Sequence, residues 1–342
     1  MITETINKVV AYENLTRAEA RGVMNAIMSG EATDAQIASF LTAMRMKGET
    51  VDEITAFASV MREKAETVSI GETCVIDTCG TGGDAAGTFN ISTTAAFVAA
   101  GAGARVAKHG NRSVSSRCGS ADVLEALGVA INIDAPAICE IVNKAGIGFL
   151  FAPALHTAMK YVMPARKQMG IRTVFNILGP LTNPAGASAQ VVGVYDPELT
   201  ETLAHVLGNL GAAHVLVVHG AGGLDELSTL GESRISEMKD GRVTTYTINP
   251  KDMALPVATI TDIKGGDAVE NARILEAVLD GESGPRRDIV RLNAAAALVA
   301  ADLAEDLPSG LKMATASIDS GAARDKLDQL VTLSGKYAEA GN

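Results

Sequence analysis

The sequence predicts an α/β protein in which a small helical domain precedes a larger domain with a mostly parallel central sheet. Residues 1–69 carry apolar side chains at helical spacing and show no strand pattern. From about residue 71, short apolar runs alternate with helical runs, which is typical of a parallel sheet with ligand-binding loops at the carboxyl ends of its strands. We therefore expect a helical domain over residues 1–69 and an α/β domain over residues 70–342. Whether part of residues 166–190 joins the helical domain stays open.

Capping boxes mark the helix starts within residues 1–69. In each box, a Thr side chain and a Glu or Gln three residues later bond each other's backbone N–H groups. Gly30 and Gly48 follow the first two of these helical runs as stop signals. We hypothesise that the surplus apolar face of these helices makes a dimer contact. The boxes are Thr16-x-x-Glu19, Thr33-x-x-Gln36 and Thr50-x-x-Glu53.

Residues 77–93 form a loop between a predicted strand and an Ala-rich predicted helix (94–102). Such a loop presents backbone N–H groups and the positive end of a helix to an anion. Its glycines, among them Gly80, Gly82 and Gly83, let a ligand approach the backbone closely. The segment therefore predicts a site for a phosphorylated ligand. Side chains in the positions of helix caps and hydroxyl ligands are Asn90, Ser92 and Thr93.

Two known phosphate loops fit this segment less well. Gly82 and Gly87 have the spacing of the Walker A glycines, but Thr88 follows where a Lys is required. The dinucleotide fingerprint, matched in spacing from Gly80, expects an acidic residue about 20 residues further on. The next predicted strand (104–107) is followed by Lys108 instead, and a cation there suits a further phosphate.

Asp84 adds a carboxylate to the glycine-rich loop. A carboxylate beside phosphates is repulsive unless it binds ribose hydroxyls or lies near a metal cation. This residue therefore favours a ligand that carries a ribose or a bound metal ion.

A second polar loop is predicted over residues 108–120. It contains three cations, four hydroxyls and two glycines, which is typical of a flexible phosphate clamp. The alternative for Arg112 and Arg117 is an ordinary solvated surface loop. We expect Ser120 to cap the following helix (121–127), and we leave the role of His109 open.

Residues 146–151 read as a buried strand, and residues 151–184 place sparse polar groups in an apolar context. Such singly placed groups suit the lining of a small-molecule pocket. Arg166 is a candidate partner for a carboxylate, because a guanidinium matches its geometry. A surface arginine on a helix is an equal alternative.

Two further strands are predicted over residues 190–195 and 214–219, with a helix (199–210) between them. The second strand leads into a glycine-rich loop that ends in Asp225 and Glu226. Adjacent carboxylates at a strand's end fit a Mg²⁺ site. A helix N-terminus with favourable acidic residues is an equal alternative.

The rest of the chain predicts a hairpin and two covering helical runs. Asp240 and Gly241 separate two strand-like runs, 234–239 and 242–248, as in a β-hairpin. Residues 289–303 and 313–337 are largely helical and are expected to cover the sheet.

Composition restricts the partners. The formal net charge of −11 argues against nucleic acid or an anionic membrane as the main partner. No apolar run approaches the ~20 residues of a membrane span. The four cysteines lack metal-ligand spacing and no secretory signal precedes them, so we expect reduced thiols in a cytoplasmic protein.

Taken together, the motifs resemble those of the anthranilate phosphoribosyltransferase family over nearly the whole chain. The resemblance implies a fold shared with the pyrimidine nucleoside phosphorylases and a dimer formed through the helical part. It also implies transfer of the phosphoribosyl group of phosphoribosyl pyrophosphate (PRPP) to anthranilate, with release of pyrophosphate, in tryptophan biosynthesis. The motifs are Asp77-x-Cys79-Gly-Thr-Gly-Gly-Asp84, Asn90-x-Ser92-Thr93, Lys108-His-Gly-Asn-Arg112, Gly119-Ser-Ala-Asp122, residues 171–184 and Leu224-Asp-Glu226.

The resemblance further implies site residues. Magnesium, with two ions expected per subunit, would use Ser92, Asp225 and Glu226, and anthranilate would meet Gly80, Asn111 and Arg166. No general base is implied, and His109 is only a weak candidate. The PRPP site would use Gly80, Gly83, Asp84, Thr88, Asn90, Ile91, Ser92, Thr93, Lys108, His109, Gly110, Asn111, Arg112, Ser113, Val114, Ser115, Ser116 and Ser120.

Three alternatives remain beside this interpretation. The nearest is a pyrimidine nucleoside phosphorylase on the same fold. The second is a paralogue that kept the phosphoribosyl site, lost anthranilate and binds nucleic acid, which the net charge and Arg166 disfavour. The third is a dinucleotide-dependent oxidoreductase, which Lys108 disfavours.

Overall fold

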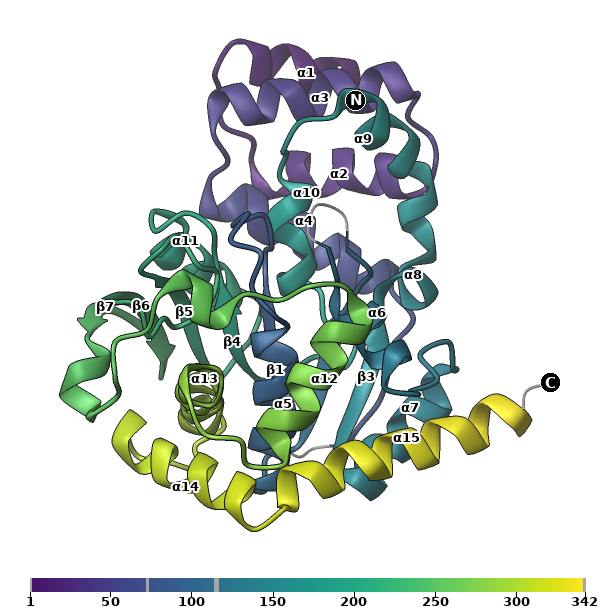
Figure 1. Cartoon of the computed structure of the whole chain (residues 1–342). Coiled ribbons are helices and arrows are strands. Elements are labelled where there is room, and N and C mark those ends of the chain that lie inside the picture. The colour runs from purple at the N-terminus through teal and green to yellow at the C-terminus, as the bar shows by residue number, and fades with distance from the viewer. Residues whose placement is uncertain (1, 72–73, 114–116, 341–342) are drawn as a thin grey trace.

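The computed structural model describes residues 2–71, 74–113 and 117–340. Its N-terminal part is a bundle of helices α1–α4, at the top of Figure 1. All three predicted capping boxes are confirmed, each with both reciprocal hydrogen bonds in place. Gly30 and Gly48 lie just beyond α2 and α3 with φ of 76° and 87°, which confirms the predicted stops. The helices are α1 (Ile2–Val10), α2 (Arg17–Met28), α3 (Asp34–Lys47) and α4 (Val51–Lys64).

A later stretch of the chain packs on this bundle. In Figure 1 it rises in teal from α8 to α9, which lies beside α1–α3. Val162, Ala165 and Phe175 are buried in the same apolar cluster as side chains of α2–α4. Residues 162–181 thus share their core with the helical bundle. The elements are α8 (Ala152–Leu155), η1 (Thr157–Tyr161), α9 (Met163–Met169), α10 (Phe175–Leu178) and η2 (Gly179–Leu181).

The sheet of the larger domain has the order β3-β2-β1-β4-β5-β6-β7. Strands β1 to β5 run parallel, and β6 and β7 continue the sheet as an antiparallel hairpin. This confirms the mostly parallel sheet and the predicted hairpin, whose turn residues Asp240 and Gly241 have φ of 51° and 73°. The strands are β1 (Ile76–Gly80), β2 (Val106–Gly110), β3 (Ile147–Phe151), β4 (Ala189–Gly193), β5 (His214–Gly220), β6 (Ser233–Lys239) and β7 (Arg242–Ile248).

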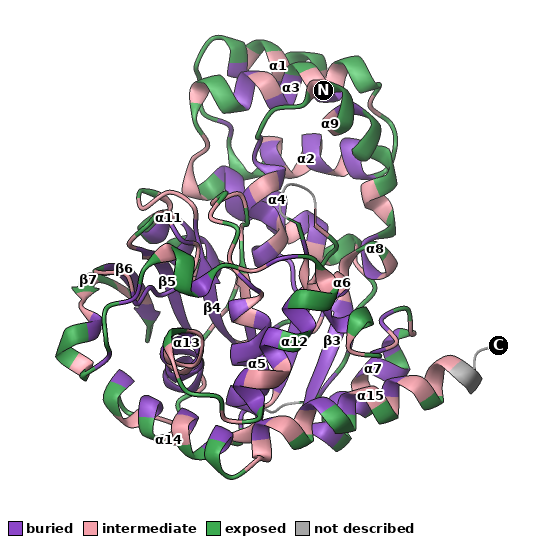
Figure 2. Cartoon of the chain, in the orientation of Figure 1, coloured by how far each residue is buried: buried purple, intermediate pink, exposed green. Residues whose placement is uncertain are grey.

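Helices cover both faces of the sheet. On one face the largest apolar cluster joins alternate strand residues, such as Ile76 and Val191, to α5 and to α12–α15. On the other face, α7 packs on β3, and α11 and α4 pack behind β4 and β5. Figure 2 shows the central strands and α13 in the buried colour. The helices are α5 (Ile91–Gly101), α6 (Ser120–Ala126), α7 (Ala135–Ala145), α11 (Leu199–Asn209), α12 (Ala268–Leu279), α13 (Pro285–Ala300), α14 (Leu307–Asp319) and α15 (Ala322–Ala340), with η3 (Pro250–Met253) and η4 (Ile260–Ile263) between β7 and α12.

Some predicted boundaries are wrong. β2 begins and ends later than predicted, so Lys108, His109 and Gly110 are strand residues and not loop residues. The predicted helical run 313–337 is divided into α14 and α15, because the chain turns at Gly321 with φ of 79°. Within the described part of the chain, no helix combines the length and the apolar character that crossing a membrane requires.

Candidate active site

The polar loops meet at the carboxyl ends of the central strands. β1 pairs with β2 on one side and with β4 on the other, so the strand order reverses between β1 and β4. Ligands of such sheets bind at this reversal, outside the carboxyl ends of the strands. Gly80 and Gly193 end these two strands and are register partners. The glycine loop after β1 and the loop after β5 come together here.

Asp225 lies directly on the end of β1. Its Oδ2 accepts a hydrogen bond of 2.8 Å from the backbone N–H of Gly82. A Cβ atom on Gly80 would lie 2.3 Å from the same carboxylate oxygen, so this strand end must be glycine for the carboxylate to approach. The acidic pair of the β5 loop is therefore docked on the glycine loop.

Glu226 reaches the start of α5. Its Oε1 accepts a hydrogen bond of 3.0 Å from the backbone N–H of Ser92, in the first turn of that helix. The positive helix end thus faces a carboxylate here, as it would face an anionic ligand. Asp84, in the glycine loop, faces Asp225.

The carboxyl groups of Asp225 and Glu226 have raised pKa values. Burial is the main cause for both. The charge of Asp84 raises the pKa of Asp225 further, and the charge of Asp225 raises that of Glu226. A divalent cation would relieve this repulsion, so the donor set fits Mg²⁺. Among the described residues no three His, Cys, Asp or Glu side chains are arranged to hold a metal alone, so phosphate oxygens and water would complete the coordination.

The glycine loop has an unusual backbone. Gly82, Gly83 and Gly87 have φ of 66°, 81° and 66°, and Ala85 has φ of 55°. A side chain from outside the loop holds it: the guanidinium of Arg172 donates to the carbonyl oxygen of Gly83. The loop thus combines positive φ angles, which favour glycine, with an external anchor at Gly83.

Arg172 also stacks on the ring of Tyr195, with 4.4 Å from its Cζ to the ring centroid. Tyr195 follows β4, and its backbone N–H donates to Thr81 Oγ1 at 3.3 Å. Arg172 therefore joins the glycine loop, the end of β4 and the segment that leads to α10. Arg172 lies in the 171–184 motif, but the sequence predicts no role for it.

Lys108 is buried, with 4% exposure. Its ammonium donates to the carbonyl oxygen of Thr78 and approaches Ser92 Oγ at 3.4 Å. Its charge also acts on Asp77 and Glu226. The structure therefore places this predicted ligand residue beneath the acidic pair and the first turn of α5.

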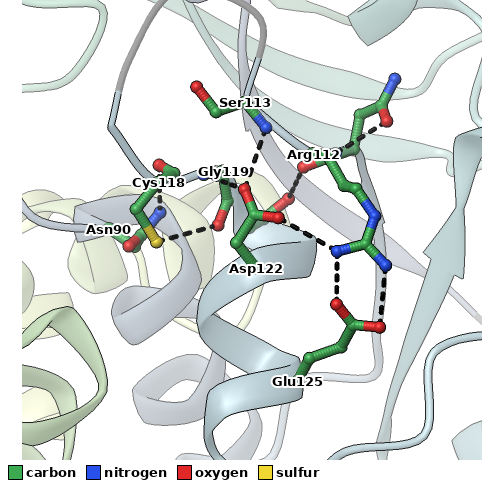
Figure 3. A network of polar contacts seen from close by, with 9 residues as sticks. Asn90, Arg112, Ser113, Cys118, Gly119, Asp122 and Glu125 are labelled. Carbon is green, nitrogen blue, oxygen red and sulfur yellow. Dashed lines mark hydrogen bonds and ion pairs between the residues drawn. The ribbon is translucent and has the colours of Figure 1, made fainter. Parts of the chain in front are cut away.

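The loop after β2 is tied to α6 (Figure 3). Arg112 forms ion pairs with Asp122 and Glu125, and its Nη2 lies 2.8 Å from Glu125 Oε1. Asp122 Oδ2 accepts from the backbone N–H groups of Ser113 and Gly119 at 3.0 and 2.8 Å. Arg112 is thus paired with two carboxylates in the loop for which a flexible phosphate clamp was predicted. Val114, Ser115 and Ser116, which the prediction included, lie outside the described residues.

Two predicted helix caps differ in detail. Ser120 is the first residue of α6 and not its cap, since Gly119 occupies that position. Asn90 is the N-cap residue of α5, but its amide makes no cap bond. It donates to the carbonyl of Cys118 at 3.3 Å (Figure 3). It also accepts from Asn271 at 2.9 Å. Asn90 thus joins the second loop to the start of α5.

His109 lies on the other face of β2, beside His156. The ring centroids are 5.1 Å apart, and His109 Nε2 has no hydrogen-bond partner among the described residues. Burial, and then the neighbouring His156, lower the pKa of His109 to about 3. Burial lowers the pKa of His156 to about 4. Both rings are therefore neutral near pH 7.

Arg166, on α9, is half-buried. Its Cζ lies 5.4 Å from the ring centroid of Phe175, and its guanidinium has no hydrogen bond or ion pair to another described residue. Burial lowers its pKa. A guanidinium in this state is suited to bind an anion.

Two further predicted site residues make local backbone contacts. The side-chain oxygen of Asn111 accepts from the backbone N–H of Arg112 at 2.7 Å, and Thr88 pairs with Lys264 in an isolated β-bridge.

The structure also places residues that sequence reasoning missed. Asp77 and Asn183 are buried and joined by a hydrogen bond of 2.8 Å between Asn183 Nδ2 and Asp77 Oδ2. Both belong to quoted motifs, yet nothing in their spacing indicates that they meet. A charged residue inside an otherwise apolar strand was the available signal for Asp77.

The fold and site define a glycosyl transferase with a helical bundle and an α/β domain. The glycosyl transferase family's helical bundle domain matches residues 3–65, and its a/b domain matches residues 72–324. The anthranilate phosphoribosyltransferase of Moorella thermoacetica is 56% identical over 97% of this chain and 98% of its own. The chain belongs to the anthranilate phosphoribosyltransferase family. Its activity is transfer of the phosphoribosyl group of PRPP to anthranilate.

Solved structures agree with this assignment. The anthranilate phosphoribosyltransferase of Thermus thermophilus has a TM-score of 0.91 and 43% identity, over 96% of this chain and 99% of that one. The Saccharomyces cerevisiae enzyme in complex with PRPP and Mg has a TM-score of 0.91 and 27% identity, over 98% of both chains. The yeast enzyme with 4-fluoroanthranilate has a TM-score of 0.88 and 26% identity, also over 98% of both chains. These relatives do not favour the nucleoside phosphorylase alternative.

Proposed function

We propose that PRPP binds across the carboxyl ends of β1, β4 and β5, with its pyrophosphate on the glycine loop. The observation that carries the proposal is the meeting of Asp225 and Glu226 with the backbone N–H groups of Gly82 and Ser92. The loop backbone and the start of α5 supply donors, and Lys108 supplies a buried positive charge. The yeast relative in complex with PRPP and Mg supports this placement. We propose as the complete PRPP site all the residues that the family resemblance implies for this ligand.

Asp225 and Glu226 would hold magnesium, and the hydroxyl oxygen of Ser92 would be a further ligand. Two ions would bind per subunit. The raised pKa values of the two carboxyls support a cation at this place. A bound Mg²⁺ stabilises the negative charge that develops on departing pyrophosphate. Asp84 faces the same space and would bind ribose hydroxyls or the metal's water.

Anthranilate would lie between Gly80, Asn111 and Arg166. The guanidinium of Arg166 is half-buried and unpaired among the described residues, which suits a carboxylate. The 4-fluoroanthranilate complex of the yeast relative supports a site for this ligand class.

Precise positioning of the two substrates would supply most of the rate enhancement. The amine of anthranilate is a neutral nucleophile, so it needs to be held in line with the anomeric carbon and not strongly activated. Alignment of reacting groups accounts for up to ~7–11 kcal/mol in intramolecular analogues. The lowered pKa of His109 makes this residue a poor general base, so we assign none.

We also propose that the chain acts as a cytoplasmic homodimer that contacts its copy through the helical domain. Exposed apolar residues of α1, α3 and the turn after α1, namely Val10, Tyr12 and Met46, support such a contact. The four free cysteines support a reducing compartment. The domains would divide near residue 69, with residues 162–181 added to the helical domain. Sedimentation that gives only monomer at micromolar concentration would contradict the dimer, and cell fractionation tests the compartment.

The reaction itself is tested by anthranilate fluorescence with protein, PRPP and Mg²⁺, and with an EDTA control. We expect a Mg²⁺-dependent loss of signal matched by pyrophosphate release. Arg166→Gln should raise KM for anthranilate by about tenfold and leave PRPP binding unchanged, since one charge-assisted bond is lost. Equal effects on both substrates would contradict the assigned pocket.

A further inference from the structure

The hydrogen-bond ladder between β1 and β2 stops after one pair. Ile76 and Val106 are the only register partners within these two fully described strands, whereas β2 and β3 pair over their whole length. In a continued parallel ladder Thr78 would pair with Lys108. Thr78 N–H would then donate to the carbonyl of Ala107, and His109 N–H would donate to the carbonyl of Thr78. The strands separate instead.

Side chains replace the missing ladder bonds. The carbonyl of Ala107 accepts from Asn183 Nδ2 at 2.8 Å. The N–H of His109 donates to Asp77 Oδ1 at 3.1 Å. The carbonyl of Thr78 accepts from the ammonium of Lys108. Buried backbone groups need such partners, so the gap between the strands is a built feature.

Asp77 and Asn183 form the centre of this arrangement. Both are buried, with 0% and 1% exposure, and Asn183 Nδ2 donates to Asp77 Oδ2 at 2.8 Å. Asn183 Oδ1 accepts from the backbone N–H of Ala185 at 2.8 Å, which fixes the orientation of the amide. One carboxylate and one amide thus hold β1, β2 and the 183–185 turn at fixed separations.

The gap also sets the place of Lys108. Its ammonium bridges the gap to Thr78 and lies 3.4 Å from Ser92 Oγ. If the ladder continued along both strands, His109 N–H would bond the Thr78 carbonyl and would compete there with this ammonium. The separation of the strands therefore determines where the buried positive charge meets the first turn of α5.

We propose that Asp77 and Asn183 are positioning residues that hold β1 and β2 apart and thereby place Lys108 beneath the PRPP site. This inference rests on the proposed role of Lys108 in binding PRPP. Neither residue touches substrate in this arrangement; each acts through Lys108.

The test compares Asp77→Asn, Asn183→Ala and Lys108→Ala. PRPP binding in the presence of Mg²⁺ is measured by calorimetry, and kcat and both KM values are measured by the fluorescence assay. We expect Asp77→Asn and Asn183→Ala to raise Kd and KM for PRPP by about tenfold or more, because small misplacements in a site have large effects. KM for anthranilate should change less.

The Lys108→Ala variant separates the two hypotheses. If it leaves PRPP binding unchanged, the proposed role of Lys108 is wrong. If it weakens PRPP binding while folded Asp77→Asn and Asn183→Ala bind PRPP as the native protein does, the positioning role is wrong. Should Asn183→Ala fail to fold, Asn183→Ser, which keeps a small donor, replaces it; should Asp77→Asn fail to fold, the variants of Asn183 carry the test.

A swap and a distant variant complete the test. In Asp77→Asn/Asn183→Asp the mutual hydrogen bond can re-form with the new amide at position 77 as the donor, but the carbonyl of Ala107 loses its donor and faces a carboxylate, so PRPP affinity should stay as low as in the single variants. A folded swap that binds PRPP as the native protein does contradicts the proposal. His214→Asn is the matched control, because His214 is equally buried and bonds Glu237 and Asp302 at the opposite end of β5. It should lower the melting temperature and leave KM for PRPP within twofold.

Discussion

A Cβ atom on Gly193 would lie 1.5 Å from the main-chain carbonyl oxygen of Asp225. Gly193 ends β4, and its register partner Gly80 ends β1 and approaches the Asp225 carboxylate. The loop that carries the acidic pair therefore rests directly on the ends of the two central strands. No side chain can stand at Gly193 unless the backbone of Asp225 moves away.

This contact predicts a large effect of Gly193→Ala. The displaced loop should carry Asp225 and Glu226 away from the glycine loop, so kcat/KM for PRPP should fall by more than about tenfold. Overpacking should also cost about 1–3 kcal/mol of unfolding free energy. Steady-state kinetics and thermal unfolding check both. Gly335→Ala is the control: this glycine lies in α15 with open space around it, and Ala there should leave activity unchanged.

The raised pKa of Glu226 predicts a pH-dependent requirement for Mg²⁺. Protons compete with the metal for this carboxyl, so the Mg²⁺ concentration that gives half-maximal rate should rise between about pH 8 and about pH 6, by up to about tenfold per unit. Titrations of the rate with Mg²⁺ at several pH values measure this. Glu226→Gln should need about tenfold more Mg²⁺ and show a weaker pH dependence.

The same shift has a consequence for the metal-free protein. The folded pKa lies above the unfolded value, so this carboxyl contributes stability that is present at low pH and is lost as pH rises through the folded pKa. In EDTA, the melting temperature of the native protein should therefore fall more between about pH 6 and about pH 8 than that of Glu226→Gln. Parallel curves for the two proteins would contradict the raised pKa.

His109 should not act as a general base. Its pKa of about 3 leaves the ring neutral and weakly basic. We expect His109→Ala to lower kcat by less than about tenfold, much less than Lys108→Ala or the joint loss of Asp225 and Glu226. The pH profile of kcat should contain no step near pH 6.5 that disappears in this variant. Such a step, together with a fall as large as that of Lys108→Ala, would overturn this expectation.

The features that could be predicted from the sequence are those encoded locally. The capping boxes, the glycine loop and the Asp240-Gly241 hairpin depend on residues a few positions apart, and all are found in the structure. The acidic pair could be placed at a strand's end, but not on Gly80 and Gly193, because that contact joins three separate strands. Arg112 was assigned to a phosphate clamp or to a solvated surface loop; its ion pair with Glu125 could not be predicted, because Glu125 faces it only once α6 has formed.

The limit of local reasoning also appears in the capping boxes. The Gln36 box lies at the surface, whereas the side chain of Glu53 is completely buried. Glu53 accepts from Leu15 N–H at 2.8 Å and pairs with Lys47, whose side chain is 3% exposed, at 2.9 Å. The same sequence spacing therefore corresponds to a surface cap at Gln36 and to a cap that is also part of a buried ion pair at Glu53.

This difference predicts unequal costs of removal. Glu53→Gln leaves a buried ammonium without its charged partner and should lower the unfolding free energy by about 3–5 kcal/mol. Gln36→Ala removes only a surface cap and should cost about 1 kcal/mol or less. Urea unfolding of both variants tests the prediction, and equal midpoints would show that the Lys47–Glu53 pair is not buried in solution.

Arg172 should be needed for PRPP binding without touching the acidic pair. Its guanidinium bonds the Gly83 carbonyl and stacks on Tyr195, so Arg172→Ala should loosen the glycine loop and raise KM for PRPP by about five- to tenfold. Arg172→Lys should be only partly active, since an ammonium lacks the planar face. Tyr195→Phe keeps that stacking face and should behave as the native protein, whereas Tyr195→Ala should resemble Arg172→Ala. If both Tyr195 variants match the native KM for PRPP, the stacking does not hold the loop, and the contact with Gly83 alone must account for any effect of Arg172→Ala.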